Sequence, residues 1–276
     1  QYYYPEPFRI TDICEELVGH GHEVTVITGV PNYPEGITYE SYRKGKKRDE
    51  VINGVKVHRC FTVERRTGTV YRFLNYYSFA VSSWLYVSKL KCGNKKEKPF
   101  DAVFVNQLSP VMMAYAGIRA KKKWNIPMTM YCLDLWPESL VAGGITSESV
   151  IYKLFHCLSK RIYRQADKIL ITSEMFQKYF EDEFEIGRNK IGYLPQYAES
   201  IFEQKMECVS KETIDLMFAG NIGTMQSVDT IVKAARILEH KYANLRWHII
   251  GSGTELENIK ELVKGYHLEN VIIYGR

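Results

Sequence analysis

The 276-residue chain alternates short apolar runs with segments in which apolar residues recur every three or four positions. This alternation constrains the fold most, because short strands that alternate with helices predict a parallel sheet covered by helices on both faces, that is, an α/β protein. The predicted strands are residues 23–28, 55–61, 102–105, 128–133, 168–172, 216–219, 247–250 and 271–274. The predicted helices are residues 8–18, 71–90, 112–122, 150–163, 174–180, 228–239 and 256–263.

The alternation occurs in two series, which predicts two Rossmann-like domains. The first domain covers residues 1–197 and the second residues 213–276, while residues 198–212 are polar, weakly periodic and suited to a linker. No strand precedes the first predicted helix, and the second series is about half of the ~150 residues that such a domain needs. We therefore expect a fragment that lacks the first strand and the second half of the second domain.

Composition excludes several classes of protein. Apolar residues make up 45% of the chain, too many for a disordered protein, and no run approaches the ~18 apolar residues of a spanning helix. The six cysteines are scattered, without a C-x-x-C pair or a Cys/His cluster, which argues against a zinc site or a disulfide framework. With no signal peptide visible, we expect a cytoplasmic protein with reduced cysteines and no metal.

The net charge of +5 is unevenly placed. Basic residues gather at positions 43–48, 89–98 and 121–123, which suits either anionic partners or solvated loops and helix ends. Because the clusters are separate and no recognition motif accompanies them, we expect no nucleic-acid partner.

Two glycine turns follow neighbouring predicted strands of the second domain. A strand, a tight glycine loop and a helix N-terminus bring backbone N–H groups and a positive dipole end to one point, which suits a diphosphate. Neither full G-x-G-x-x-G spacing nor a Walker Lys-Ser/Thr pair is present, and glycines in such turns also serve packing alone. The candidate diphosphate-binding residues are Gly220, Asn221, Ile222, Gly223, Gln226, Gly251 and Gly253.

Polar and aromatic residues also follow predicted strands of the first domain, where α/β proteins place catalytic groups. Asp134 comes directly after the strand 128–133, in the segment Asp-Leu-Trp-Pro-Glu. The alternative is a helix N-cap aspartate beside a buried tryptophan, with turn-forming Pro and Asn elsewhere. The candidates in this domain are Glu6, Arg9, Asn32, Tyr33, Asp134, Trp136 and Glu138.

An ordered set of short motifs covers essentially the whole chain. It comprises residues 4–9 (YPEPFR), 21–26 (GHEVTV), 31–36 (PNYPEG), 134–139 (DLWPES), 194–199 (LPQYAE) and 219–226 (AGNIGTMQ). This set resembles family 4 of the retaining glycosyltransferases, in particular a subgroup similar to fucosamine transferases of bacterial O-antigen and capsule assembly.

The resemblance implies a GT-B fold and a retaining, hexosyltransferase-type enzyme. The second domain would bind a nucleotide-diphospho-sugar, usually UDP-linked and here an N-acetylated amino or deoxy sugar, without a metal. The first domain would bind a polyprenol-linked or glycan acceptor. In this scheme Asp134, Glu138 and Glu6 are the catalytic candidates. The acceptor-binding candidates are Arg9, Asn32, Tyr33 and Trp136.

Three departures from the family pattern affect these roles. Asn221 and Gln226 stand where many members carry an Arg and a Lys that hold the diphosphate, so binding would depend on backbone dipoles. Asp134 stands where an active-site His is common. The family's E-x7-E motif, which contacts the donor, would lie beyond Arg276, so we expect this chain alone to be inactive.

The predicted helix from Tyr71 to Lys91 is rich in aromatic residues and is followed by lysines. Such a helix suits the inner face of the cytoplasmic membrane, and the alternative is a core helix with a charged end. Two other functions share the fold: a nucleotide-sugar 2-epimerase, which needs no acceptor, and a non-catalytic relative that binds nucleotide.

Overall fold

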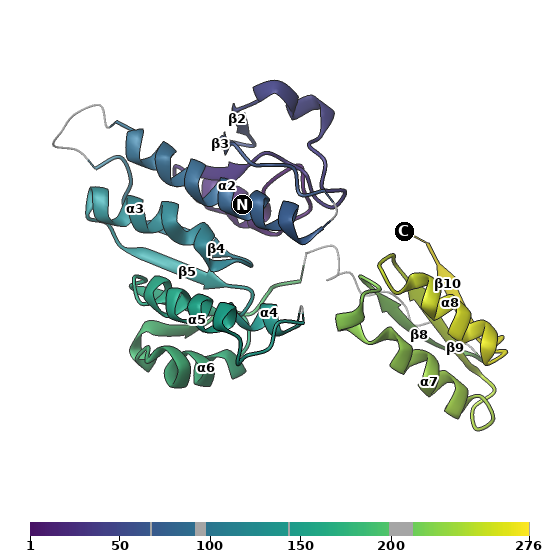
Figure 1. Cartoon of the computed structure of the whole chain (residues 1–276). Coiled ribbons are helices and arrows are strands. Elements are labelled where there is room, and N and C mark those ends of the chain that lie inside the picture. The colour runs from purple at the N-terminus through teal and green to yellow at the C-terminus, as the bar shows by residue number, and fades with distance from the viewer. Residues whose placement is uncertain (67, 92–97, 143, 199–211, 276) are drawn as a thin grey trace. The chain divides into compact units, whose positions relative to one another are not determined.

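The computed structural model describes residues 1–66, 68–91, 98–142, 144–198 and 212–275. The chain divides into two compact units, residues 1–197 (unit 1) and 198–276 (unit 2) (Figure 1). Each unit is built from strands and helices in alternation, and each has its own hydrophobic core.

The first sheet of unit 1 has the order β1-β3-β2. Its strands are β1 (Thr25–Gly29), β2 (Asp49–Ile52) and β3 (Val55–Cys60). β1 pairs with β3 in parallel, whereas β2 and β3 form an antiparallel hairpin. Asn53 and Gly54 make its turn with φ of 46° and 84°, the left-handed backbone that an Asn-Gly hairpin turn requires. The alternating pattern did not predict β2.

The second sheet of unit 1 is entirely parallel, with the order β4-β5-β6-β7. Its strands are β4 (Val103–Gln107), β5 (Met128–Cys132), β6 (Lys168–Ile171) and β7 (Ile191–Tyr193). Buried side chains of β5 and β6 pack against aromatic residues of the helices and form the main core. The helices of unit 1 are α1 (Ile10–Gly19), α2 (Thr69–Lys89), α3 (Tyr115–Trp124), α4 (Glu138–Ala142), α5 (Val150–Tyr163) and α6 (Met175–Phe184), with 3-10 segments η1 (Glu40–Gly45), η2 (Val111–Ala114) and η3 (Arg188–Lys190).

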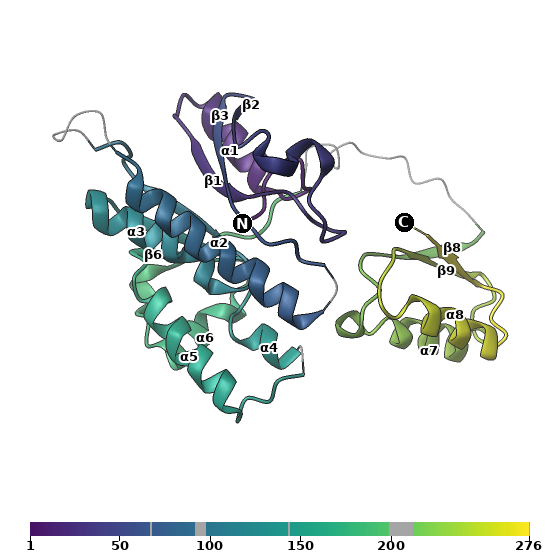
Figure 2. The same ribbon diagram turned by 45° about the horizontal axis from the view of Figure 1, so that its top comes forward.

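Unit 2 has a parallel sheet with the order β10-β9-β8. Its elements are β8 (Ile214–Ala219), η5 (Thr224–Gln226), α7 (Val228–Leu238), β9 (Leu245–Ile250), α8 (Leu256–Gly265) and β10 (Val271–Tyr274). Both helices lie on the same side of the sheet (Figure 2), and their apolar faces enclose the buried residues Val232, Ile249 and Ile259.

The side of α2 that faces the protein buries polar residues beside the apolar Phe79, Ala80 and Val87. Asn75 and Ser83 are fully buried, and Asn75 Nδ2 donates to the Val63 carbonyl oxygen at 2.5 Å. Ser78 Oγ accepts from the Val63 N–H at 2.9 Å, and Ser82 Oγ donates to the Phe61 carbonyl at 2.7 Å. These bonds join α2 to the segment that follows β3.

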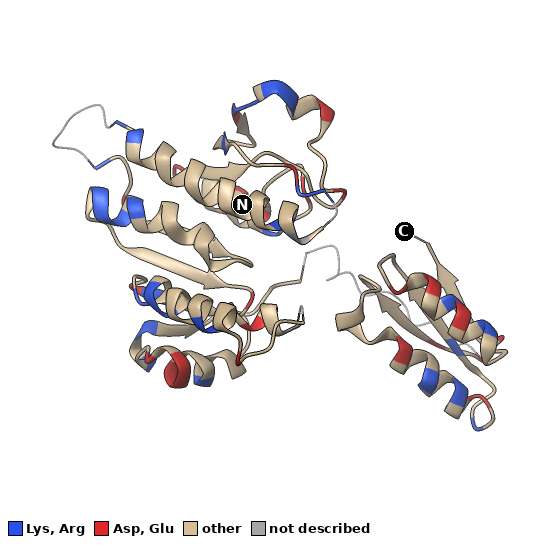
Figure 3. Ribbon diagram, viewed as in Figure 1, with Lys and Arg blue, Asp and Glu red and all other residues tan. Residues whose placement is uncertain are grey.

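The opposite side of α2 is apolar and exposed. It presents Val70, Tyr71, Phe73, Leu74, Tyr77, Val81, Trp84 and Leu85, each at least 40% exposed. The charged residues of the helix, Arg72 and Lys89, lie toward its two ends (Figure 3). An ordinary surface helix turns polar and charged residues outward, whereas α2 turns an apolar strip outward. None of the helices described in the structure is long and apolar enough to span a membrane.

Candidate functional site

The two glycine turns of unit 2 are joined by backbone hydrogen bonds. In the turn after β8, the Gly220 N–H donates to the Ile250 carbonyl at 3.0 Å, and the Ile222 N–H donates to the Ser252 carbonyl at 2.9 Å. The Ile222 carbonyl in turn accepts from the Glu255 N–H at 3.0 Å. Ile222 is completely buried beneath the turn. The sequence therefore builds one rigid platform from two loops at the carboxyl edge of the sheet.

Close packing explains the glycines of the second turn. A Cβ at Gly251, whose φ is +147°, would lie 1.9 Å from the Gly220 carbonyl oxygen, and a Cβ at Gly253 would lie 2.2 Å from that of Ile222. Real Cβ atoms do not approach backbone so closely. Packing alone therefore explains why both positions are glycine. The predicted role of these two glycines in donor binding is not needed to explain them.

The glycines of the first turn have a different environment. A Cβ at Gly220 would touch only the Phe218 ring, at 3.4 Å. A Cβ at Gly223 would meet the ends of the Asn221 and Gln226 side chains, at 2.7 and 2.9 Å. These two amides hydrogen-bond to each other at 3.0 Å across Gly223, and both are exposed. Movable side chains, not backbone, therefore border this side of the turn.

The first turn also presents free backbone donors. Among the described residues, no group accepts from the N–H of Asn221 or of Gly223. The chain carries no Lys or Arg from residue 212 to residue 232, and the nearby Glu255 is engaged by Thr224 Oγ1 at 3.1 Å. The local sequence of this turn therefore offers an anion backbone N–H groups and side-chain amides.

Glu6 is buried under a turn of unit 1. Only 3% of the residue is exposed, and its Oε1 atom accepts from the N–H groups of Asn32, at 2.9 Å, and of Tyr33, at 2.8 Å. Burial raises the pKa of the Glu6 carboxyl, although these two donors oppose the shift. Asn32 is 1% exposed, whereas Tyr33 is half-buried against Phe8. The structure thus gives Glu6 and Asn32 a role in holding the turn.

Asp134 lies at the carboxyl end of β5 and is half-buried. The Ser109 hydroxyl donates to Asp134 Oδ2, and Ser109 Oγ lies 2.9 Å from Ser139 Oγ. Asp134 does not cap α4, which begins at Glu138. Ser109 was not among the predicted site residues, although its position just after a strand end resembles that of Asp134.

The other two candidates in this segment have structural partners. Glu138 Oε1 accepts from the hydroxyls of Tyr152 and Tyr179, the latter at 2.9 Å, so it joins the start of α4 to α5 and α6. Burial, followed by the neighbouring Glu138 carboxylate, raises the pKa of both phenols, which keeps them protonated donors. Trp136 is 7% exposed and packs in the core against Phe155, with ring centroids 5.6 Å apart. This is the buried tryptophan of the alternative interpretation.

A cavity of about 220 Å³ opens where the carboxyl ends of β4 and β5 meet the start of α1. Arg9 lines this cavity, and its guanidinium donates to the Tyr197 carbonyl. Tyr197 Oη in turn donates to Asp12 Oδ2 at 3.0 Å. Arg9 is the only predicted site residue on this wall, although the wall includes the residues that precede Ser109 and Asp134. The cavity is lined chiefly by Phe8, Arg9, Asn106, Leu108, Tyr131, Leu133, Gln196 and Tyr197.

Comparison with known families assigns both units. Residues 8–196 match the family described as "Glycosyl transferase 4-like domain", and residues 202–276 match "Glycosyl transferases group 1". The first match alone covers more than half of the chain.

Two curated relatives are similar over nearly the whole chain. WcaI of Escherichia coli strain K12, named as a glycosyl transferase of colanic acid biosynthesis, is 23% identical over 94% of this chain and 65% of its own length. The 2-deoxystreptamine N-acetyl-D-glucosaminyltransferase of Niallia circulans is 24% identical over 95% and 66%. The chain thus spans just under two thirds of the length of these relatives.

Two solved structures share the fold. WaaG, a glycosyltransferase involved in lipopolysaccharide biosynthesis, superposes with a TM-score of 0.60 at 11% identity, over 96% of this chain and 65% of that one. A glycosyltransferase from Rickettsia africae gives a TM-score of 0.58 at 12% identity, over 96% and 63%. The predicted α/β fold of GT-B type with parallel sheets is confirmed, and unit 2 is short.

Proposed function

The chain belongs to the glycosyl transferase 4-like and group 1 glycosyltransferase families. We therefore propose that the protein is a retaining glycosyltransferase of cell-surface polysaccharide synthesis. The enzyme moves an N-acetylated amino or deoxy sugar from a UDP-sugar to a lipid-linked or glycan acceptor. It needs no metal ion and works in the cytoplasm, at the inner face of the membrane.

The observation that carries the proposal is the first glycine turn of unit 2. The free N–H groups of Asn221 and Gly223 stand ahead of the N-terminus of α7, where the helix dipole favours negative charge. Hydrogen bonds from such donors to the diphosphate strengthen as charge develops on the leaving group. In this scheme the Asn221 and Gln226 amides separate when the donor enters, and Gly220 leaves room beside it.

The cavity of unit 1 suits the acceptor. Its wall combines the aromatic rings of Phe8 and Tyr131 with the polar groups of Arg9 and Asn106, a mixture that fits the apolar faces and hydroxyls of a sugar. The cavity lies beside residues that follow the strand ends, where ligands of open α/β sheets bind.

We propose Asp134 as the catalytic group. The Ser109 hydroxyl fixes the orientation of its carboxylate at the carboxyl edge of the sheet. A fixed negative charge there stabilises an oxocarbenium-like transition state or orients the attacking hydroxyl of the acceptor. Glu138 and Glu6, by contrast, act through the segments that they hold.

We propose that the exposed apolar side of α2, its outward face, contacts the membrane. Exposing so many aromatic and aliphatic side chains of one helix to water is unfavourable. Laid on a bilayer, the same face buries these side chains at the interface, where Trp and Tyr are favoured. A peripheral position would bring the enzyme to an acceptor that is attached to a lipid.

The proposal is tested by sugar transfer. The 276-residue chain, and any longer protein that contains it, are each incubated with labelled UDP-N-acetyl sugars and a bacterial lipid extract, and label is followed into the lipid fraction. We expect transfer with retained anomeric configuration, lost in Asp134→Asn. Isomerisation or hydrolysis of the UDP-sugar that is indifferent to the acceptor would instead identify an epimerase. The same assay tests whether the 276 residues alone are inactive.

A further inference from the structure

The segment that covers the end of η1 and the connection to β2 carries a high density of positive charge. Residues 43–48, Arg-Lys-Gly-Lys-Lys-Arg, are all exposed, and we call them the basic loop. Lys44, Gly45 and Lys47 adopt φ of 57°, 75° and 50°, so the backbone turns sharply and presents its side chains outward. The loop lies beside β2, where Figure 3 shows it as a blue segment of the ribbon.

Ion pairs among the described residues of unit 1 do not neutralise the charge of the basic loop. None of its five cations forms an ion pair with a carboxylate of the described residues. The neighbouring acids have other partners: Asp49 lies 2.5 Å from His58 Nδ1, and Glu50 lies 2.6 Å from the buried Arg59. A cluster of unpaired cations sets up a positive potential that attracts phosphate.

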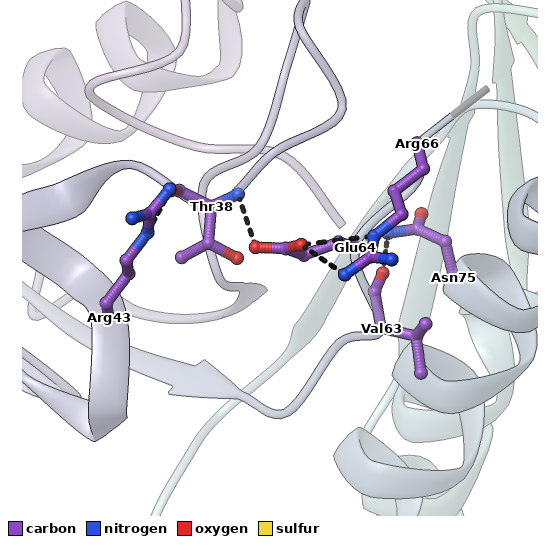
Figure 4. Close-up of polar contacts among 6 residues, drawn as sticks. All are labelled: Thr38, Arg43, Val63, Glu64, Arg66 and Asn75. Atoms are coloured by element: carbon purple, nitrogen blue, oxygen red, sulfur yellow. Dashed lines mark hydrogen bonds and ion pairs between the residues drawn. The ribbon is translucent and has the colours of Figure 1, made fainter.

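The basic loop is fastened at both ends, which distinguishes it from a free basic tail. At its start, Arg43 Nε donates to the Thr38 carbonyl at 3.1 Å, and the Thr38 N–H donates to Glu64 Oε1 at 3.1 Å (Figure 4). Further along, the Lys47 ammonium lies 5.1 Å from the centre of the buried Tyr42 ring. Glu64 therefore connects the loop to the segment that leads into α2.

The same series of contacts leads from the loop to the outward face of α2. The Arg66 guanidinium lies 3.4 Å from Glu64 and 5.5 Å from the centre of the Tyr71 ring. Arg65 lies 5.8 Å from the centre of the Tyr76 ring. Cations thus border the N-terminal part of an exposed apolar strip, and such a surface matches an amphiphile with an anionic head.

We propose that the basic loop, together with Arg66, binds phosphate groups carried by lipids at the membrane surface. The inference rests on the membrane contact proposed for α2 and assigns the charged part of that contact to a separate segment. Two lipids offer this chemistry, an anionic phospholipid headgroup and the diphosphate of a lipid-linked acceptor.

The test compares the wild-type protein with a triple variant, Lys44→Gln, Lys46→Gln and Lys47→Gln. A matched control, Lys241→Gln, Lys260→Gln and Lys264→Gln, removes the same charge from exposed positions of unit 2. Each protein is sedimented with phosphatidylcholine vesicles that are pure, contain phosphatidylglycerol or contain a prenyl diphosphate. We expect the loop variant to bind the phosphate-rich vesicles about 10- to 100-fold more weakly, and the control to bind like wild type.

The vesicle types identify the source of the phosphate. A loss confined to prenyl diphosphate vesicles assigns the loop to the acceptor, and a loss with phosphatidylglycerol assigns it to the bilayer; either supports the inference. Equal binding by the loop variant and wild type, or an equal loss in the control, overturns it. Wild-type binding that ignores anionic lipid also overturns it but leaves the α2 contact standing. Donor binding, measured separately, reports on the transferase proposal independently of these outcomes.

Discussion

The Cα atom of Gly253 lies so near Ile222 that an added Cβ would stand 2.2 Å from the Ile222 carbonyl oxygen and 2.4 Å from its carbonyl carbon. Neither backbone segment is free to move, because the Ile222 carbonyl also accepts from Glu255 and its N–H donates to Ser252. The first glycine turn of unit 2 therefore depends on close packing by a glycine of the second turn.

Gly253→Ala should separate the two turns of unit 2. We expect a loss of about 1–3 kcal/mol in the free energy of unfolding, measured in urea, together with weaker nucleotide binding. Gly265→Ala is the control, because nothing lies within 4 Å of its Cβ and it ends helix α8. A Gly253→Ala protein as stable as the control would contradict the packing account.

Glu6→Gln should be tolerated, because the amide oxygen still accepts from Asn32 and Tyr33. Burial raises the folded-state pKa of Glu6, so wild type loses stability as the pH rises from the ordinary value of 4.5 through that higher pKa. The Gln variant has no such loss. Its stability relative to wild type should therefore increase across this pH range and then level off.

Glu6→Ala is the matched comparison, since it leaves two buried N–H donors without an acceptor and should cost about 1–3 kcal/mol at every pH. Urea unfolding at pH 4 and pH 8 checks both variants. If the Gln variant is as unstable as the Ala variant at pH 8, the structural role given to Glu6 is wrong.

Asp134→Asn should reduce sugar transfer by about 10²- to 10⁴-fold while the protein stays folded, because the position keeps its shape but loses its negative charge. Ser109→Ala removes only the group that orients the carboxylate, and we expect a drop of about fivefold. Steady-state rates at saturating acceptor measure both effects. Full activity of the Asn variant would exclude a charge-based role for Asp134.

Replacing Phe73, Tyr77 and Trp84 by Ser should abolish vesicle binding with little effect on folding. These side chains are 42–57% exposed, so each change should alter the free energy of unfolding by no more than about 0.5 kcal/mol. Phe79→Ala, on the buried side of α2, should instead destabilise by about 3–5 kcal/mol. A triple variant that still sediments with vesicles would contradict the membrane contact.

Local sequence patterns sufficed for most of the elements. The helix predicted at 150–163 and the strand predicted at 271–274 are confirmed with the same bounds, because strong periodicity and a short apolar run define them. β2 was missed because a helix-strand alternation leaves no place for a hairpin, although Asn53-Gly54 was the available signal. β7 was missed because its pairing, not an apolar run, makes it a strand.

The site was harder to predict, because its contacts join residues far apart in the sequence. Ser109 meets Asp134 across 25 positions, and Tyr179 meets Glu138 across 41. Sequence position correctly placed Asp134 at the end of a strand but gave no sign of the partners of Asp134 and Glu138. The packing role of Gly253 is likewise visible only once the two turns lie together.

The most direct test of the account is a calorimetric titration of the chain with UDP in the absence of divalent metal. Wild type should bind saturably through the turn at Gly223, and Gly223→Trp should lose binding while its circular dichroism remains that of a folded protein. If folded wild type binds neither UDP nor GDP nor TDP, or if the Trp variant binds as well as wild type, the assignment of this turn to the donor diphosphate is wrong.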